Sequence, residues 1–133
     1  MTARAAVLLI ALAATAARPA VAQTAVSALP PPPGLLVVPF ENPQHDPRSY
    51  WLGEAAAILL TEDLNARGIN AIPRAARVQA FDQLHLPLAA SLSRATVIKV
   101  GQIVGASRVI VGDLEFEGDT LIVRATPIRL DVG

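Results

Sequence analysis

Residues 108–130 read RVIVGDLEFEGDTLIVRATPIRL, and this stretch decides the fold class. It begins as a continuous apolar run, which is typical of a strand buried on both faces. It then alternates between apolar and polar residues as far as Glu117, as a strand with one solvated face does. Gly118 and Asp119 follow as a two-residue turn, because glycine readily takes the positive φ that such turns need. The stretch therefore predicts a C-terminal β-hairpin whose first strand is only half covered.

The return strand of this hairpin changes phase. Its first apolar set is Leu121, Val123 and Ala125, whereas after Pro127 the apolar set is Ile128, Leu130 and Val132. One residue inserted into a strand moves the following side chains to the other face of the sheet. We therefore predict a β-bulge near Pro127.

Upstream of the hairpin, strand and helix patterns alternate. Apolar runs bounded by glycine or proline predict two short strands, at Leu35–Phe40 and Ile69–Ile72. Helical spacing, caps and breakers predict three helices. They run from Asp46-Pro47 to Gly68, with Ser49 as the competing cap, from Arg74 to Leu84, and from Ser91 or Ser93 to Gly105. The prediction is an α/β fold with about three helices and a C-terminal β-hairpin.

The N-terminus carries the marks of export. An apolar run from Ala5 to Ala17 follows Arg4 and leads to the small residues Ala20-Val21-Ala22. This pattern predicts a signal peptide over residues 1–22, cleaved between Ala22 and Gln23, with a retained signal anchor as the alternative. The run is shorter than the roughly 20 apolar residues that span a bilayer, so we expect no transmembrane segment in the mature chain. We expect a periplasmic protein.

The domain boundaries follow from composition. Residues 23–34 are rich in alanine and proline and end in PPPPG, which favours an extended linker over a packed segment. We place the folded domain at residues 35–133. The chain has no cysteine, which excludes a disulfide framework and a lipid anchor on cysteine. We expect a packed core to provide the stability.

The charge balance argues against nucleic acid as a partner. The chain has 11 Lys and Arg against 11 Asp and Glu. Arg4 and Arg18 leave with the signal peptide, so the mature chain carries 9 basic against 11 acidic residues, a net charge of about −2. Without a basic cluster, electrostatic capture of nucleic acid or anionic lipid is not expected.

Catalytic and metal-binding patterns are weak. Only His45 and His85 could serve as imidazole bases, and neither has a triad-like arrangement in the sequence. Glu41, His45 and Asp46 do not have the spacing of a zinc or calcium loop. The glycines of Gly101–Gly105 follow a helix and lack the Lys-Ser/Thr of a phosphate loop. We therefore predict no catalytic residue, no metal and no cofactor.

The motifs along the chain resemble those of the TolB amino-terminal-like domains, which are related to FlgO and more distantly to the CsgG curli-secretion proteins. The resemblance covers most of residues 35–133, and its most specific parts lie at the first strand–helix corner and around the last two strands. These parts are Val38–Asn42 with Asp46-Pro47, Trp51–Glu54, Val104–Gly112, Leu121–Ala125 and Leu130-Asp131. The resemblance implies a periplasmic α/β module, with a small mixed β-sheet and helices packed against it. It also implies that the module has no catalytic residues and is often followed by tetratricopeptide repeats.

Together these observations predict a non-catalytic interaction module of the cell envelope. It would be the N-terminal adaptor of a larger repeat-containing protein and would dock an envelope protein or its own C-terminal repeats. The alternatives are a structural subunit of an envelope or secretion assembly, as in CsgG, and a small-ligand binder with a pocket between the first loop and the last helix. For Tyr50 and Trp51 we favour core anchoring over partner contact. The candidate interaction residues at the corner are Phe40, Glu41, Asn42, Asp46, Tyr50, Trp51 and Glu54.

Overall fold

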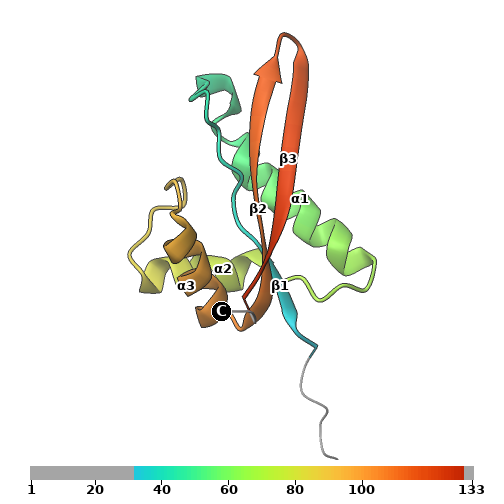
Figure 1. Ribbon diagram of the computed structural model, residues 1–133, viewed down its shortest axis with the longest axis vertical. Coiled ribbons are helices and arrows are strands. Elements are labelled where there is room, and N and C mark those ends of the chain that lie inside the picture. The colour runs from blue at the N-terminus through green and yellow to red at the C-terminus, as the bar shows by residue number, and fades with distance from the viewer. Residues whose placement is uncertain (1–31, 131–133) are drawn as a thin grey trace, which may run out of the picture.

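The computed structural model describes residues 32–130. The predicted signal peptide (residues 1–22), its cleavage site and most of the predicted linker lie outside the described residues. The elements run in the order β1 (Gly34–Val37), the 3-10 helix η1 (Pro47–Ser49), α1 (Leu52–Ala66), α2 (Arg74–Gln83), α3 (Arg94–Ile103), β2 (Ala106–Glu117) and β3 (Thr120–Arg129). Figure 1 shows the β2–β3 hairpin as a long ribbon whose tip projects beyond the helices.

Within residues 32–130 the strands form one mixed sheet in the order β1-β2-β3. β1 pairs in parallel with β2, so that Val37 lies opposite Ile110, and β2 pairs antiparallel with β3. Gly118, with φ 61°, makes the turn between β2 and β3. This arrangement confirms the predicted fold class and the predicted hairpin.

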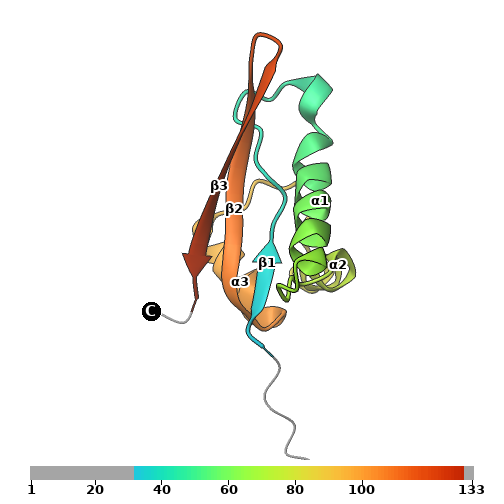
Figure 2. The same cartoon turned by 90° about the vertical axis from the view of Figure 1, so that its right-hand side faces the viewer.

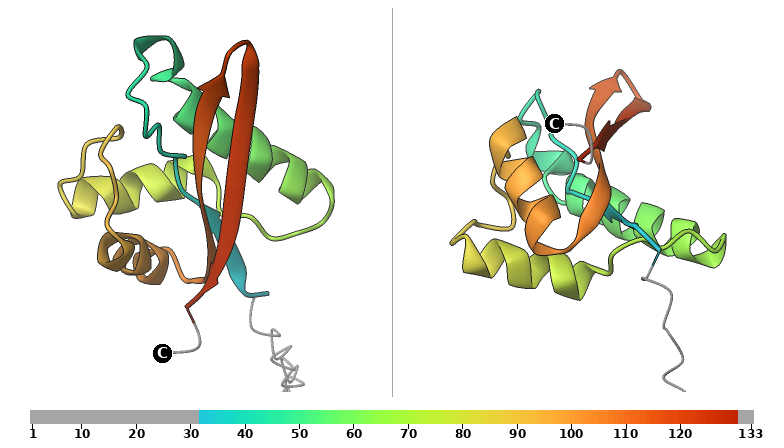
Figure 3. Two further views of the ribbon diagram at one scale, coloured as in Figure 1. Left: turned by 45° about the horizontal axis from the view of Figure 1, so that its top comes forward. Right: turned by 60° about the horizontal axis from the view of Figure 1, so that its bottom comes forward.

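Both faces of the sheet are covered at its base. Successive β2 side chains point to opposite faces, so Val109 and Leu114 enter different clusters. Figure 2 shows α1 running alongside β1 and β2, with β3 on the far side, and the right-hand view of Figure 3 shows α3, α2 and α1 around the base of the sheet. The α1 cluster contains Val37, Phe40, Ala57 and Leu114. The α2–α3 cluster contains Leu36, Val38, Ile72, Ala80, Phe81, Val97, Val100 and Val109.

The helix ends follow from local chemistry. Gly68, with φ 79°, ends α1, because its N–H donates to the Asn65 carbonyl while the next N–H donates to Leu64. The predicted cap Ser93 accepts a hydrogen bond from the Thr96 N–H at the start of α3, which confirms it over Ser91. Gly68 fixes where the chain leaves α1, and Ser93 fixes where it enters α3.

The prediction for the first helix start was wrong. Asp46-Pro47 begins only the short helix η1, and α1 itself starts at Leu52 with no side-chain cap at Trp51. The Ser49 N–H donates to the Asp46 carbonyl, which closes a single 3-10 turn. Two residues, Tyr50 and Trp51, separate this turn from α1. Leu52, the first residue of α1, packs against the α1 cluster.

The predicted strand at Ile69–Ile72 was also wrong. The segment makes one isolated parallel bridge, Leu35 with Ala71. The Leu35 N–H donates to the Asn70 carbonyl, and the Ile72 N–H donates back to the Leu35 carbonyl. Pro73 caps α2 immediately afterwards, so the segment has no room to extend the ladder. It nevertheless covers the outer edge of β1.

The predicted bulge at Pro127 is absent, because the β2–β3 register runs without interruption from Arg108 opposite Arg129 to Glu117 opposite Thr120. Among the described residues, Leu121, Val123 and Ala125 lie on one face and Ile128 and Leu130 on the other. Leu130, with its neighbour Ile128 on the same face, packs towards the α2–α3 cluster. Leu121 and Val123 lie on the α1 side and are 40% and 49% exposed. The apolar side chains change face along β3 because a different face of the sheet is covered at each end of the strand.

Candidate binding site at the first strand–helix corner

The corner between β1 and α1 is fixed by close backbone contacts. The Phe40 N–H donates to the Gly53 carbonyl (3.1 Å), and a Cβ on Gly53 would overlap the Phe40 carbonyl oxygen. The Phe40 side chain is buried and lies against Gly112. Glu41 continues along β2, donating to the Gly112 carbonyl (2.8 Å) and accepting from the Leu114 N–H (2.9 Å). Only glycine fits at position 53 beside the Phe40 carbonyl, which explains the glycine in the Trp51–Glu54 motif.

The loop that follows is held by its own side chains. Asn42 Nδ2 donates to the Asp46 carbonyl (3.1 Å) and to Ser49 Oγ (2.8 Å), and the buried Ser49 donates in turn to the Asp46 carbonyl. Gln44 bonds the Phe116 backbone on β2 with both atoms of its amide. These contacts pin both ends of the loop, so the residues on its outer side are held in place.

Tyr50 and Trp51 lie on the surface. Their side chains are 72% and 63% exposed, so the core-anchoring role that we favoured was wrong. The reason is the late start of α1, because Leu52 rather than an aromatic residue packs on the α1 cluster. Two large rings are thereby left next to each other on a rigid corner.

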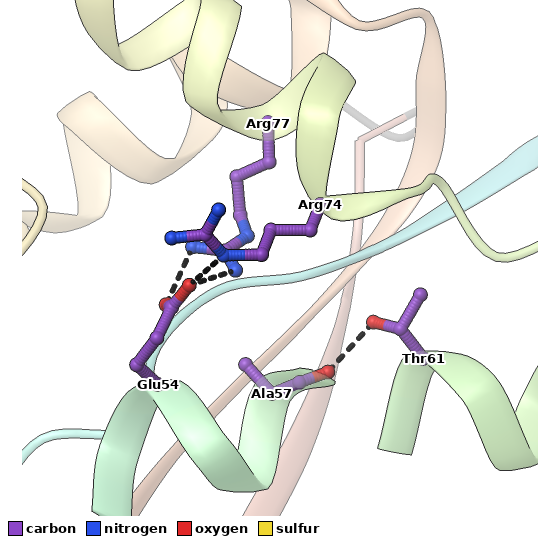
Figure 4. Close-up of polar contacts among 5 residues, drawn as sticks. All are labelled: Glu54, Ala57, Thr61, Arg74 and Arg77. Atoms are coloured by element: carbon purple, nitrogen blue, oxygen red, sulfur yellow. Dashed lines mark hydrogen bonds and ion pairs between the residues drawn. The ribbon is translucent and has the colours of Figure 1, made fainter. Parts of the chain in front are cut away.

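Glu54 turns inward and ties α1 to α2 (Figure 4). Its carboxylate accepts from Arg74 Nε (2.6 Å) and from both terminal nitrogens of Arg77 (2.9 Å each). Arg77 is 3% exposed and stacks over the Phe81 ring. Partial burial raises the pKa of Glu54, but the hydrogen bonds and charges of Arg77 and Arg74 outweigh it and hold the pKa below its ordinary value. Glu54 therefore stabilises the fold below the corner.

The seven candidate residues line one depression of about 630 Å³. Its opposite wall is the connection between α2 and α3, residues 88–91, which sequence reasoning did not assign to the site. Ser91 Oγ reaches Glu41 across the depression (3.4 Å), and Leu88 is 42% exposed. The run Leu84–Ser93 has no strong periodicity, so the only signal for this wall was an apolar residue in a long connection. Asn42 Oδ1 is buried and has no hydrogen-bond partner among the described residues.

A second, smaller depression of about 330 Å³ lies between the first loop and α3, where a ligand pocket was predicted. Val38 and Glu41 line one side, Arg94 and Val97 another, and Thr126 and Ile128 of β3 complete it. It has about half the volume of the corner depression and fewer polar residues in its lining. We therefore place the candidate site at the corner.

Residues 32–130 contain two histidines, His45 and His85. Neither histidine is paired with a nucleophile in the contacts that the structure gives. The His45 ring is exposed and bonds the Pro43 carbonyl, and Ser49 bonds Asn42 and the Asp46 backbone. Within the same residues no group of three His, Asp or Glu side chains could hold a metal ion. No helix among them is both long and apolar enough to cross a membrane.

Taken together, the elements and the corner define a small α/β domain with a three-stranded mixed sheet across residues 32–130. No protein-family model matches the chain, and no curated protein matches its sequence. Its structure is similar to that of the LpoB C-terminal domain from Salmonella enterica, with a TM-score of 0.55 and 19% sequence identity over 76% of this chain and 74% of that chain. The likeness shows a shared α/β fold. The resemblance to TolB amino-terminal-like domains stays a prediction.

Proposed function

We propose that this protein is a non-catalytic interaction module of the cell envelope that binds a partner protein through the corner depression. The observation that carries the proposal is the exposure of Tyr50 and Trp51 at the corner. The backbone there is held by hydrogen bonds from Phe40 to α1 and from Glu41 to β2. Large aromatic residues are enriched among the residues that dominate binding energy at protein interfaces. A rigid corner also loses little conformational entropy on binding.

The chemistry around the two rings describes the partner. Glu41 is exposed beside the depression, so this part of the rim carries a carboxylate. Leu88 adds an exposed apolar surface on the opposite side. The depression therefore suits a protein segment that presents an apolar or aromatic side chain next to a lysine or arginine.

Several observations support the envelope as the location. The N-terminal pattern predicts a signal peptide, and the motifs resemble those of periplasmic TolB-like modules. The fold is shared with the C-terminal domain of LpoB. We propose that the partner is another envelope protein or a repeat domain that follows in the same polypeptide, and that the module acts without a catalytic step.

Site-specific photo-crosslinking in living cells tests the proposal. A photoreactive phenylalanine analogue is placed at position 51 or 50, and in a control at position 59, because Leu59 is 66% exposed on α1 and does not line the depression. We expect a discrete crosslinked species from positions 50 and 51 and none from position 59. The crosslink should weaken at least tenfold when Glu41→Lys reverses the charge of the rim.

The opposite results would overturn the proposal. Equal crosslinking from positions 51 and 59 would mean that the corner is not a specific surface. No crosslink from either ring, with the protein present at normal abundance in the same cells, would remove the corner as a docking site.

A small ligand is the second candidate, because two observations favour it. The depression of about 630 Å³ falls within the roughly 300–1,000 Å³ of typical ligand pockets. The buried Asn42 Oδ1 also lacks a donor among residues 32–130, which a ligand could supply. A thermal-shift screen with nucleotides, sugars and muropeptides, compared with Asn42→Ala, tests this. A shift that survives Asn42→Ala would place the ligand elsewhere.

A further inference from the structure

The two edges of the sheet are treated differently within residues 32–130. The outer edge of β1 is covered by residues 70–72, through the hydrogen bonds of Leu35 with Asn70 and Ile72. Above β1, the same side of β2 is covered by Val38, by Glu41 and finally by the Gln44 side chain at Phe116. No described strand lies beyond β3. The outer side of β3 is therefore the open edge of the described sheet.

The register shows which β3 residues present their backbone at that edge. Gly112 and Leu114 use their backbone groups towards Glu41, on the side away from β3. Their opposite residues, Ala125 and Val123, therefore do not exchange ladder bonds with them. At the base, the Leu130 N–H donates to the Ser107 carbonyl, so the backbone groups of the even-numbered residues of this strand face β2 and those of the odd-numbered residues face outward. The N–H and C=O groups of Leu121, Val123 and Ala125 thus point outward.

Proline closes this open stretch at one end. Pro127 continues the same outward-facing series, so its missing N–H lies at the outer edge and removes no bond to β2. The turn at Gly118 closes the other end. The open stretch is Thr120–Thr126, with Val123 at its centre.

The side chains of this stretch are self-complementary. If two copies pair antiparallel about Val123, then Val123 faces its own copy and Leu121 faces Ala125 of the partner, a large residue against a small one. Leu121 and Val123 are already exposed apolar side chains on a single face, and they would join into one strip. Each outward-facing pair would exchange two N–H···O bonds.

The charges are arranged for the same pairing. The hairpin tip is acidic, with Glu117 and Asp119, and the base of the hairpin carries the exposed Arg108. An antiparallel pair places the tip of each copy alongside the base of the other. Arg124, the charged residue in the open stretch, is neutralised within its own chain, since it pairs with Asp113 (3.1 Å) and with Glu115. Edge charges usually prevent such pairing, and here the charge at the centre is neutralised.

We propose that two copies of this chain associate through their β3 edges, antiparallel and centred on Val123, to form a continuous six-stranded sheet. The surface is distinct from the corner depression, and the proposal does not rest on the function given to that depression. It favours a second copy over an unrelated strand, because the pairing and the charges of the hairpin complement themselves. Such a dimer would also be consistent with the alternative function, a structural subunit of an envelope assembly.

Disulfide trapping tests the register directly, because the chain has no cysteine. Opposite residues of a hydrogen-bonded antiparallel pair have Cα atoms about 5.5 Å apart, within the 4.4–6.8 Å that a disulfide spans. Val123→Cys, in protein expressed with its own N-terminus and purified as cells process it, should form a covalent dimer under mild oxidation. Ala125→Cys alone should not, because its two copies would lie roughly 13 Å apart along the strands. Mixing Ala125→Cys with Leu121→Cys should restore the crosslink.

Sedimentation velocity over a concentration series tests the free dimer. A single strand pair buries less than about 1,200 Å² and is expected to be weak, so the series runs into the millimolar range. Val123→Pro removes an outward N–H that β2 does not use, and should give a folded monomer with an unchanged circular dichroism spectrum. Val123→Thr and Trp51→Ala should remain dimeric, which separates this surface from the corner.

Three results would overturn the proposal. They are a monomer at every concentration, a dimer that Val123→Pro leaves intact while Val123→Cys forms no crosslink, and equal crosslinking at positions 123 and 125. A monomer that still crosslinks a partner protein through Trp51 would remove the self-association alone and leave the proposed function standing.

Discussion

The hairpin contrasts a covered half with an open half built from the same pair of strands. At the base, Val109 is fully buried within the α2–α3 cluster, and both faces of the sheet carry helices. Towards the tip, Leu121 and Val123 also have apolar side chains but are 40% and 49% exposed. The β2–β3 register is the same throughout. Pairing of β2 with β3 therefore does not require burial of their side chains. Which part of the hairpin is buried depends on where the helices pack.

The ion pairs repeat this contrast. Glu54 binds an almost fully buried arginine in the covered half, whereas Arg124 binds Asp113 and Glu115 on an exposed sheet surface. A buried pair orders two helices, while an exposed pair contributes little to stability. Mutations in the covered half should therefore affect folding, and mutations in the open half should affect association.

The largest effect is expected at Phe81, which is fully buried between α2 and the sheet. Phe81→Ala should reduce the free energy of unfolding by about 3–5 kcal/mol, because the cavity cannot fully collapse. Leu121→Ala in the open half should cost less than about 1 kcal/mol. Urea unfolding followed by circular dichroism measures both. Equal losses for the two variants would contradict the division into two halves.

The next effect is expected at the corner. Gly53→Ala should destabilise the protein by about 1–3 kcal/mol, although alanine is the better helix former, because the new Cβ overlaps the Phe40 carbonyl oxygen. Leu59→Ala on the exposed side of the same helix should change the free energy of unfolding by less than about 0.5 kcal/mol. A Gly53→Ala protein as stable as the wild type would mean that the corner is not close-packed.

The Glu54 ion pair should give a pH-dependent effect. The pKa of Glu54 is held below its ordinary value of 4.5, so its contribution is fully present above pH 4.5 and is lost as the pH falls through the lowered pKa. Glu54→Gln weakens the hydrogen bonds to Arg77 and Arg74, so it should cost about 1.5 kcal/mol at pH 7 and progressively less below pH 4.5. Glu115→Gln, which touches the exposed Arg124, serves as the control with little effect. Chemical unfolding at several pH values measures the difference, and a constant cost of Glu54→Gln down to pH 2 would refute it.

The smallest effect is a gain in stability at the end of α2. His85 has φ 55° and takes the left-handed position that usually belongs to glycine, with the Leu86 N–H bonded back to Phe81. His85→Gly should raise the free energy of unfolding by about 0.5–1 kcal/mol. His45, with φ 51°, also bonds the Pro43 carbonyl, so His45→Gly should gain less. A loss of stability in His85→Gly, measured by thermal unfolding, would show that the imidazole makes a contact that offsets the strain.

Local signals were sufficient where one residue decides the conformation. Gly68 ends α1, Ser93 caps α3 and Gly118 makes the turn between β2 and β3. Each does so through its own chemistry, and the structure confirms all three predictions. Errors arose where the outcome depends on a distant element. The Ile69–Ile72 segment has the composition of a strand, but Leu35 offers it only one bridge. The phase change at Pro127 depends on where α1 and α3 lie, which periodicity within one strand does not reveal.

The candidate site was predictable to a similar degree. The seven corner residues come from one continuous motif, so the sequence could group them. Their opposite wall, residues 88–91, comes from a connection that is distant in sequence and has no regular pattern. The exposure of Trp51 also depends on α1 starting at Leu52, a choice made by packing rather than by capping.

The parallel pairing of β1 with β2 has a consequence for the order in which the protein folds. Gly34 finds its partner at Ala106, so the first strand to be synthesised must wait for a strand from much later in the chain. The hairpin, by contrast, joins neighbours in sequence and needs only a short loop to close. We therefore expect the hairpin to form early and the insertion of β1 to limit the folding rate, so the newly made chain would expose the apolar residues of β1 until that step.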